Sequence, residues 1–240
     1  MEDKIIKGKL YLIPSPIAEH AIHTLPLSVV EAVERINFLV VERLRTARRF
    51  IRSICKGKDI DSILFFELNK HGDNPELREF LKVMLKGQDV GLISEAGLPA
   101  VADPGQNAVA WAHENGIQVV PLTGPSSIFL ALMASGLNGQ QFCFNAYLSN
   151  KKSELMRELK HLENRVRQTG ITQIFMDTPY RNIFLLETCM EALSHDTLLC
   201  IACDLTGPNE NIKTLKIEQW KKTTAEYLNK QAAIFLIGKS

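Results

Sequence analysis

Short apolar runs and amphipathic helical patterns alternate along almost the whole chain, and this alternation restricts the fold more than any other feature. Nine runs are predicted to be strands, at residues 9–14, 38–42, 63–68, 90–94, 118–123, 142–148, 172–177, 197–205 and 232–238. Eight segments are predicted to be helices, at residues 26–36, 43–55, 75–86, 104–115, 126–136, 151–168, 180–194 and 221–230. This order is typical of an α/β protein whose helices pack on largely parallel sheets.

The length of the chain is compatible with one large domain or two modest ones. A chain of 240 residues is long for a single core. The turn-rich stretch TGPSS, residues 123–127, is the best candidate for a boundary. We therefore predict an N-terminal α/β domain over 1–122 and a C-terminal α/β domain over 123–240. A cleft between two domains is a common place for a ligand.

Several familiar motifs are missing, and their absence disfavours whole classes of enzyme. The sequence has no phosphate-binding GxxxxGK[ST], no GxGxxG after the first strand, no GxSxG and no HExxH. The usual kinases, nicotinamide dehydrogenases and hydrolases are therefore disfavoured, and we expect no metal site. The five cysteines occupy apolar positions, which favours buried, reduced thiols. Without a long apolar segment or a signal-peptide pattern, we expect a cytoplasmic protein that does not insert into membranes.

Three loops that follow predicted strands are unusually rich in glycine, proline and serine. They are PSPI at 14–17, SEAGLPAVADPG at 94–105 and TGPSS at 123–127. In open α/β sheets, ligands collect beyond the carboxyl ends of the strands. Glycine lets the backbone approach a ligand closely or adopt positive φ, and proline stiffens a loop. One such loop is as easily a tight turn as a binding loop, but three at strand ends favour a binding site.

These loops carry a resemblance to a known family. The segments GKLYLIPSPI, SEAGLPAVADPG and LTGPSSIFLALMASGL are similar, in order, to the signatures of the tetrapyrrole methylase superfamily. Within it, the chain is most similar to the ribosomal small-subunit RNA 2′-O-methyltransferase I subfamily. The resemblance implies the tetrapyrrole methylase fold, in which two α/β domains enclose an interdomain cleft. It also implies S-adenosylmethionine as cofactor and a homodimer.

The resemblance also implies which residues contact the cofactor, position by position. They are Pro14, Ile17, Ser94, Glu95, Ala96, Gly97, Leu98, Ser126, Ser127, Met176, Asp177, Ala202 and Ala233. The chain departs from the family where Ala18 and Glu19 follow Pro16-Ile17, and where Glu42-Arg43-Leu44-Arg45 replaces an acidic-Asp-Thr-Arg pattern. The first of these departures, at Ala18 and Glu19, flanks the substrate side of the family's site, as does a further departure in the segment TGPNENIKTLKI.

A strongly basic segment points to RNA. Residues 42–58 hold five Arg and two Lys against one Glu, a formal charge of +6, and the rest of the chain carries −5. Four of these residues share one stripe of the predicted helix: Arg45, Arg48, Arg49 and Arg52. The stripe is either a solvated basic face or a surface for RNA phosphates, and salt-dependent RNA binding would distinguish the two. Lys151, Lys152 and Arg181 are further candidates for phosphate contacts.

The chemistry predicted for this chain is methyl transfer from S-adenosylmethionine to a ribose 2′-hydroxyl of small-subunit rRNA. Because a ribose hydroxyl is a weak nucleophile, a base would assist, and Glu95 and Asp177 are the candidates. Glu95 is equally suited to bind the cofactor's ribose, and we expect Asp103 to cap the helix that starts at Pro104. Two alternatives remain: a methyltransferase acting on a small, tetrapyrrole-like molecule, and a non-catalytic homologue that binds S-adenosylmethionine or RNA.

Overall fold

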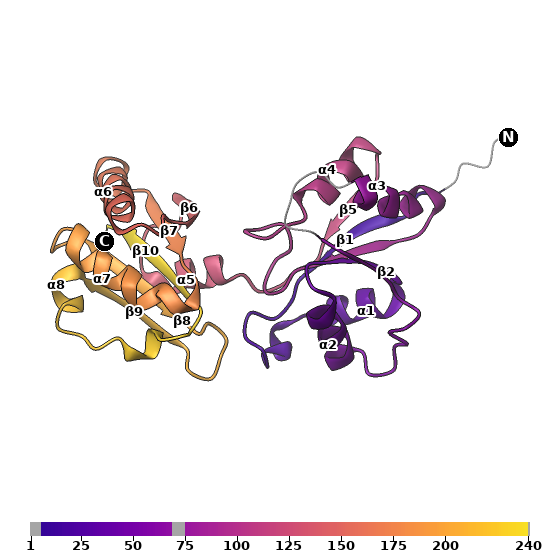
Figure 1. The fold of residues 1–240 in the computed structure, drawn as a ribbon, viewed down its shortest axis with the longest axis horizontal. Helices are drawn as coiled ribbons and strands as arrows, with labels where there is room; N and C mark the ends of the chain where they lie inside the picture. Colours follow the sequence, from indigo (N-terminus) through magenta and orange to yellow (C-terminus); the bar gives the residue numbers. More distant parts are fainter. Residues whose placement is uncertain (1–5, 69–74, 240) are drawn as a thin grey trace. The chain divides into compact units, whose positions relative to one another are not determined.

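The computed structural model describes residues 6–68 and 75–239. The chain divides into two compact units, Met1–Ser126 and Ser127–Ser240 (Figure 1). Each unit is an α/β layer structure built on a five-stranded sheet. The predicted α/β class is therefore confirmed, while the predicted boundary after residue 122 stays a prediction.

The first unit contains a wholly parallel sheet in the order β3-β2-β4-β1-β5. Its strands are β1 (Lys9–Ile13), β2 (Phe38–Val41), β3 (Leu64–Glu67), β4 (Val90–Ile93) and β5 (Gln118–Pro121). Its α-helices are α1 (Leu27–Arg35), α2 (Leu44–Ile54), α3 (Pro75–Leu81) and α4 (Gln106–Glu114), with short 3-10 helices at Ile22–Thr24 and Lys82–Lys86. One helix follows each of the first four strands, as parallel pairing requires.

Helices cover both faces of this sheet. Buried side chains of α1 and α2, such as Val33 and Ile51, form one core cluster with Ile13 of β1. Side chains of α3 and α4, such as Leu81 and Ala112, form a second cluster on the other face of the sheet. The strands buried between the two clusters are almost continuously apolar, which is the pattern expected of a parallel sheet.

The second unit corrects one prediction, because its sheet is mostly antiparallel. The strand order is β6-β7-β10-β8-β9, and only β6 and β7 run parallel. The strands are β6 (Phe142–Tyr147), β7 (Thr172–Met176), β8 (Leu198–Cys203), β9 (Asn211–Lys216) and β10 (Ala233–Gly238). The helices are α5 (Ser127–Ser135), α6 (Lys152–Thr169), α7 (Asn182–Ala192) and α8 (Ile217–Trp220), with 3-10 helices at Pro179–Arg181 and Glu226–Leu228. The last strand inserts between β7 and β8 in the opposite direction, which the pattern of apolar runs could not reveal.

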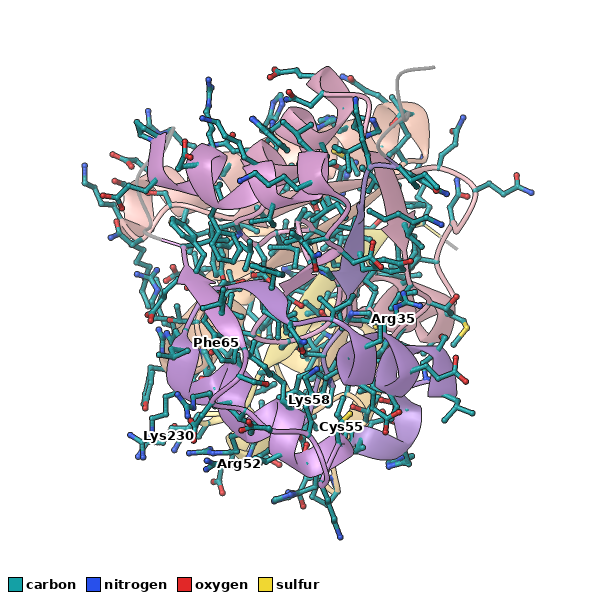
Figure 2. The ribbon with its side chains drawn as sticks, turned by 90° about the vertical axis from the view of Figure 1, so that its right-hand side faces the viewer. Arg35, Arg52, Cys55, Lys58, Phe65 and Lys230 are labelled. Carbon is teal, nitrogen blue, oxygen red and sulfur yellow. The ribbon has the colours of Figure 1, made fainter. Side chains whose placement is uncertain are left out.

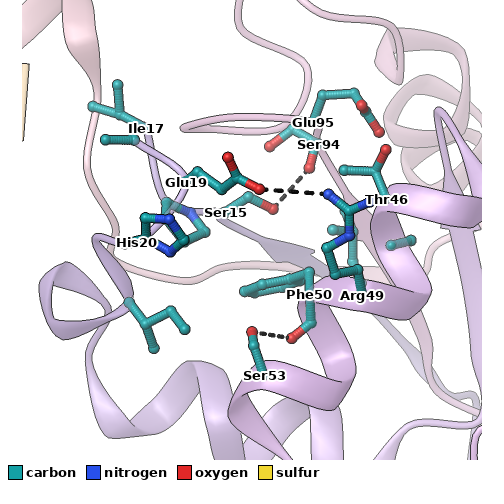
Figure 3. Close-up of a pocket in the computed structure, with 15 residues that line it drawn as sticks. Ser15, Ile17, Glu19, His20, Thr46, Arg49, Phe50, Ser53, Ser94 and Glu95 are labelled. Carbon is teal, nitrogen blue, oxygen red and sulfur yellow. Dashed lines mark hydrogen bonds and ion pairs between the residues drawn. The ribbon is translucent and has the colours of Figure 1, made fainter. Parts of the chain in front are cut away.

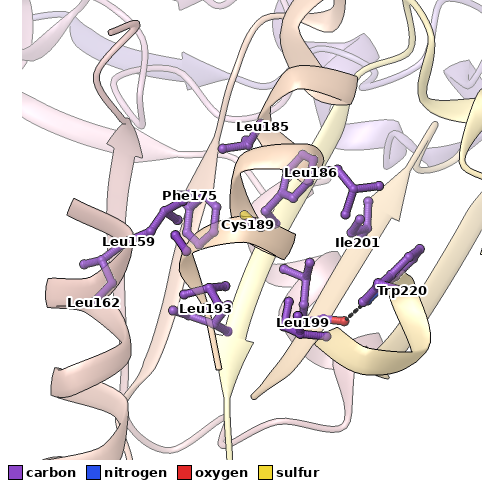
Figure 4. Close-up of a cluster of buried hydrophobic side chains, with 14 of the residues drawn as sticks. Leu159, Leu162, Phe175, Leu185, Leu186, Cys189, Leu193, Leu199, Ile201 and Trp220 are labelled. Carbon is purple, nitrogen blue, oxygen red and sulfur yellow. Dashed lines mark hydrogen bonds between the residues drawn. The ribbon is translucent and has the colours of Figure 1, made fainter. Parts of the chain in front are cut away.

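The core of the second unit lies between its sheet and the helices α6, α7 and α8 (Figure 4). Leu159 of α6 and Leu185 of α7 pack there against Phe175, whose ring stacks on that of Phe235 at 5.9 Å. The indole N–H of Trp220 donates a hydrogen bond to the carbonyl of Leu199 at 2.9 Å. This bond satisfies the single donor of a fully buried tryptophan.

Two predictions near the C-terminus were wrong. The predicted helix at 221–230 is replaced by turns and the 3-10 helix Glu226–Leu228, and strand β9 was not anticipated at all. The segment KKTTAEYLNK has only Tyr227 and Leu228 as large apolar residues, too few to give a helix a packed face. The other predicted elements occur within a few residues of their expected bounds, and Gly87 ends the third helical segment with φ +89°.

The cysteine side chains are unpaired thiols, four of them buried and Cys143 half-buried. In β8, Cys203 belongs to the core cluster beneath α7, whereas Cys200, three residues away, is buried but lies outside that cluster. This fits the prediction that the two side chains point to opposite faces. None of the helices in the described residues combines the length and apolar character of a membrane span.

Candidate functional site

The carboxyl ends of β1 and β4 form a switch point in the first sheet. These two strands are neighbours, with Ile13 paired to Ile93. The chain leaves β1 toward helix α1 on one face and leaves β4 toward helix α4 on the other. Loops that diverge in this way open a crevice at the sheet edge, which is where ligands bind in open α/β folds.

Two serines and a glycine fasten the first two of the predicted binding loops together. The backbone N–H of Ser15 donates to the carbonyl of Gly97 at 2.9 Å, and the N–H of Gly97 donates to the carbonyl of Ser15 at 3.0 Å. The hydroxyl of Ser15 donates to the carbonyl of Ser94 at 2.7 Å, and that of Ser94 to the carbonyl of Gly97 at 2.9 Å. Gly97 has φ +72°, a conformation that other residues adopt only at a cost. The four bonds hold the loops in one fixed arrangement.

The third loop packs directly on the first. A Cβ atom added to Gly124 would lie 2.3 Å from Cβ and Cγ of Pro14, far inside contact distance. Only glycine therefore allows the third loop to approach this closely. Residues of the loops at 14–17, 94–105 and 123–126 therefore lie together beyond the first sheet, and their role in binding a cofactor stays a prediction.

Part of the second loop offers unused polar backbone atoms. Ala96 is exposed, and its N–H and C=O make no hydrogen bond with any residue that the structure describes. Ile17 and Leu98 are half-buried beside it, and Pro14 and Ser126 are buried. Rigid loops with free backbone donors and acceptors beside apolar side chains suit a ligand that has both a polar and an apolar part.

A cavity of about 480 Å³ opens next to these loops (Figure 3). Its walls come from the loop after β1, from helix α2 and from the end of β4. The residues that line it are Ser15, Pro16, Ile17, Ala18, Glu19, His20, Ile22, Thr46, Ala47, Arg49, Phe50, Ser53, Ile93, Ser94 and Glu95. The cavity thus includes three residues predicted to bind the cofactor, Ile17, Ser94 and Glu95, and extends from them to helix α2.

Three carboxylates influence one another at the same edge of the sheet. Burial, together with the negative charges of Asp103 and Glu95, raises the pKa of Glu42 to about 7, although a hydrogen bond from the backbone of Glu95 and the charge of Arg43 oppose the shift. Burial and the charge of Glu95 also raise the pKa of Asp103 to about 6. Oε1 of Glu42 is buried without a hydrogen-bond partner among the described residues. Such a cluster can take up a proton near neutral pH.

Glu42 is a residue that the sequence analysis left without a role. It directly follows β2 just as Glu95 closely follows β4, so its position at a strand end was the available signal. Asp103 was expected to cap helix α4, and this was wrong: Gly105 occupies the N-cap position and no side chain caps the helix. No group of three or more His, Cys, Asp or Glu in the described residues is arranged to hold a metal ion.

The structure also brings together three of the predicted residues of the second unit. Ile234 of β10 pairs with Met176 of β7 on one side and with Ala202 of β8 on the other. Ala233 precedes Ile234, so Met176, Ala202 and Ala233 are neighbours at one edge of the second sheet. Antiparallel pairing produces this meeting, because the start of β10 lies beside the ends of β7 and β8.

Asp177, a predicted catalytic candidate, is occupied by local contacts. Its Oδ1 accepts the backbone N–H of Thr178 at 2.7 Å, and its Oδ2 forms an ion pair with Nε of Arg181 at 2.9 Å. The two side chains are only 11% and 29% exposed. Both oxygens of Asp177 are therefore already engaged by neighbouring residues of the second unit.

Most of the cations predicted to bind RNA form ion pairs within the protein. Arg48 pairs with Asp61, Arg49 with Glu19, Lys151 with Glu154 and Lys152 with Glu191. Arg45 and Arg52 make no ion pair with any residue that the structure describes, and Arg52 projects from the outer surface of α2 (Figure 2). The predicted stripe exists, since Ala47 and Ile51 on the opposite side of α2 are buried. Its free charge is concentrated in Arg45 and Arg52.

Comparison with known proteins agrees with this arrangement. The profile of the family Tetrapyrrole (Corrin/Porphyrin) Methylases matches residues 9–220. The chain belongs to this family. It is accordingly a methyltransferase, and its two α/β units fit the two-domain fold of the family.

Curated relatives in this family include proteins named Ribosomal RNA small subunit methyltransferase I. The protein of that name from Escherichia coli O157:H7 is 30% identical over 206 residues, which cover 86% of this chain and 68% of the relative. The one from Mesorhizobium japonicum is 32% identical over 209 residues, which cover 87% of this chain and 67% of the relative.

Solved structures support the fold. The methyltransferase CobJ matches with a TM-score of 0.63 at 17% identity, over 97% of this chain and 95% of that one. Uroporphyrin-III-C-methyltransferase from Thermus thermophilus matches with a TM-score of 0.57 at 17% identity, over the same shares of the two chains.

Proposed function

We propose that this methyltransferase transfers a methyl group from S-adenosylmethionine to a ribose 2′-hydroxyl of small-subunit ribosomal RNA. The observation that carries the proposal is identity of 30% and more, over most of the chain, to relatives named for methylation of that RNA. Arg45 and Arg52 of helix α2, which have no ion-pair partner in the described residues, support an RNA substrate, because cationic side chains bind the phosphates of RNA.

The residues implied by the family resemblance hold the methyl donor in this proposal. In the first unit they are Pro14, Ile17, Ser94, Glu95, Ala96, Gly97, Leu98 and Ser126, and in the second Ser127, Met176, Asp177, Ala202 and Ala233. The free backbone groups of Ala96 and the rigid bridge between Ser15 and Gly97 fit a ligand with polar ends. When bound, the donor supplies an electrophilic methyl group on a sulfonium.

The protein contributes position, exclusion of water and a proton acceptor. Holding two reacting groups in line lowers a barrier by up to roughly 7–11 kcal/mol when the geometry is near attack. Glu95 lines the cavity and is the proton acceptor that we favour over Asp177, whose oxygens are engaged. Glu42, with a pKa raised to about 7 mainly by burial, lies beside it and accepts a hydrogen bond from the backbone of Glu95.

Two measurements test the proposal. Calorimetric titration with S-adenosylmethionine and with its demethylated product should give binding of both. Maps of ribose methylation in small-subunit RNA, from cells with and without the gene, should differ at one or more positions. Absence of binding by either compound contradicts the proposed donor, and identical maps contradict the proposed acceptor. The homodimer and the cytoplasmic location stay predictions. The proposal also includes contacts between RNA phosphates and Lys151, Lys152 and Arg181.

A further inference from the structure

The cavity of the first unit contains more than the predicted donor site requires. Ile17, Ser94 and Glu95 are its only lining residues among those expected to touch the donor. Most of the remaining wall comes from the loop after Ile17, as far as Ile22, and from residues 46–53 of α2, which have no part in that expectation. Its volume of about 480 Å³ lies in the range of pockets that bind small organic groups.

The α2 wall has the composition of a site for a single base. Phe50 is half-buried and projects from α2 toward the loop that carries His20 (Figure 3). Ala47 of α2 and Ile22 of the 3-10 helix Ile22–Thr24 add apolar surface to the cavity, and Thr46 and Ser53 of α2 add hydroxyl groups. Proteins that recognise unpaired RNA bases stack them on aromatic rings and contact their edges with a few polar groups.

A weak ion pair stands at the cavity. Nη1 of Arg49 lies 3.5 Å from Oε1 of Glu19, and the two side chains are 63% and 72% exposed. Exposed pairs of this kind contribute little to stability and are screened by salt, so a phosphate can displace the carboxylate from the arginine. Arg45 and Arg52 lie about one turn of α2 before and after Arg49, where they can contact the neighbouring phosphates.

We infer that this cavity receives the acceptor nucleotide of the RNA, displaced from its neighbours. The base lies against Phe50, the phosphate binds Arg49 in place of Glu19, and the ribose faces Ser94 and Glu95. This arrangement places the 2′-hydroxyl beside the favoured proton acceptor and the donor loops. The inference rests on the proposed function and adds to it where the substrate enters.

The inference can be tested by placing a larger side chain at the edge of the cavity. Ser53 is exposed on α2, lines the cavity and donates its hydroxyl to the carbonyl of Phe50 at 2.6 Å. Ser62 is a matched control, because it is also exposed and donates to the carbonyl three residues earlier, that of Asp59, at 2.7 Å, but lies outside the cavity. Ser53→Leu and Ser62→Leu are compared with the unmodified protein. The substrate is the small ribosomal subunit from cells that lack the gene.

For Ser53→Leu we expect KM for the small subunit to rise at least tenfold, while calorimetry gives an affinity for S-adenosylmethionine within twofold of that of the unmodified protein. Ser62→Leu should leave both quantities unchanged. Phe50→Leu, which keeps an apolar side chain in the core, should also raise KM for the subunit severalfold without changing donor affinity.

The possible failures are distinguishable. Unchanged KM for both Ser53→Leu and Phe50→Leu, with an active unmodified protein, overturns the inference and leaves the proposed function intact. Loss of donor affinity in Ser53→Leu also overturns it, because the cavity would then hold the donor. An unmodified protein that binds the donor but does not methylate the subunit contradicts the proposed function and this inference together.

Discussion

Glu163 in the second unit is buried and Glu42 in the first is half-buried, and the two carboxylates have very different surroundings. Glu163, on α6 of the second unit, accepts hydrogen bonds from the N–H of Ser194 at 2.8 Å and from the hydroxyls of Ser194 and Thr197. Glu42, at the end of β2 in the first unit, has a buried oxygen without any partner in the described residues and lies near two further carboxylates. A satisfied carboxylate stabilises its fold, whereas an unsatisfied one among like charges costs stability. The first unit therefore keeps an acidic edge that costs stability, and we interpret this edge as part of the proposed functional site.

The direction of the strands in each sheet decides how many loops meet at one edge. In the parallel sheet every carboxyl end lies at the same edge, so loops after β1, β2 and β4 meet there. In the second sheet neighbouring strands mostly run in opposite directions, so the ends of β6, β7 and β8 share one edge with the starts of β9 and β10. The first unit can gather more polar groups at one edge for this reason, and three experiments test how far the contrast extends.

The largest effect is expected from Gly124→Ala. The new Cβ would collide with Pro14 at 2.3 Å and force the first and third loops apart. We expect affinity for S-adenosylmethionine, measured by calorimetry, to fall at least tenfold, and the free energy of unfolding to fall by about 1–3 kcal/mol. Gly139→Ala in the second unit is the control, since nothing lies within 4 Å of its added Cβ. Equal donor affinity in the two variants would show that the packing of these loops is not needed for binding.

A smaller effect is expected when cations are removed from each unit in turn. Arg45→Gln with Arg52→Gln removes unpaired cations, so the slope of log affinity for RNA against log salt concentration should decrease by about 2. Lys151→Gln with Lys152→Gln removes cations that already pair with Glu154 and Glu191, and should change the slope by less. Filter binding over a salt series measures both. An equal decrease of the salt slope in the two double variants would show that Lys151 and Lys152 contribute as much to RNA binding as Arg45 and Arg52.

The smallest effect concerns stability and pH. Because the pKa of Glu42 is raised from 4.5 to about 7 in the folded protein, its contribution to stability is full below pH 4.5 and is lost as pH rises to about 7. Glu42→Gln should therefore raise the melting temperature at pH 8 and leave it nearly unchanged at pH 4. Glu163→Gln should lower it at pH 8, because hydrogen bonds to a charged acceptor contribute about 1.5–3 kcal/mol. Calorimetric melting curves at both pH values measure the change in melting temperature of each variant. A lower melting temperature for Glu42→Gln at pH 8 would show that the charged Glu42 does not destabilise the fold.

Much of the candidate site could be predicted from sequence because its loops are made of conformationally special residues. Gly97 and Gly124, together with the prolines of the same loops, are typical of tight turns and close approach, so they indicated binding loops from the sequence alone. Phe50, His20 and Glu42 could not be found in this way. A phenylalanine on an amphipathic helix and a glutamate after an apolar strand are ordinary in a sequence. Phe50 becomes notable only through the cavity that it lines, and Glu42 only through the two carboxylates near it.

The amino-acid sequence by itself determined the α/β class, most of the helices and strands, and the three loops that meet at the end of the first sheet. These depend on local periodicity and on the backbone preferences of glycine and proline, which act within a few residues. Tertiary structure alone decided the direction of β10, the strand β9, the pairing of Arg49 with Glu19 and the cavity beside α2. Each of these joins segments distant in the chain or requires a choice between strand directions that apolar patterns leave open, and packing makes that choice.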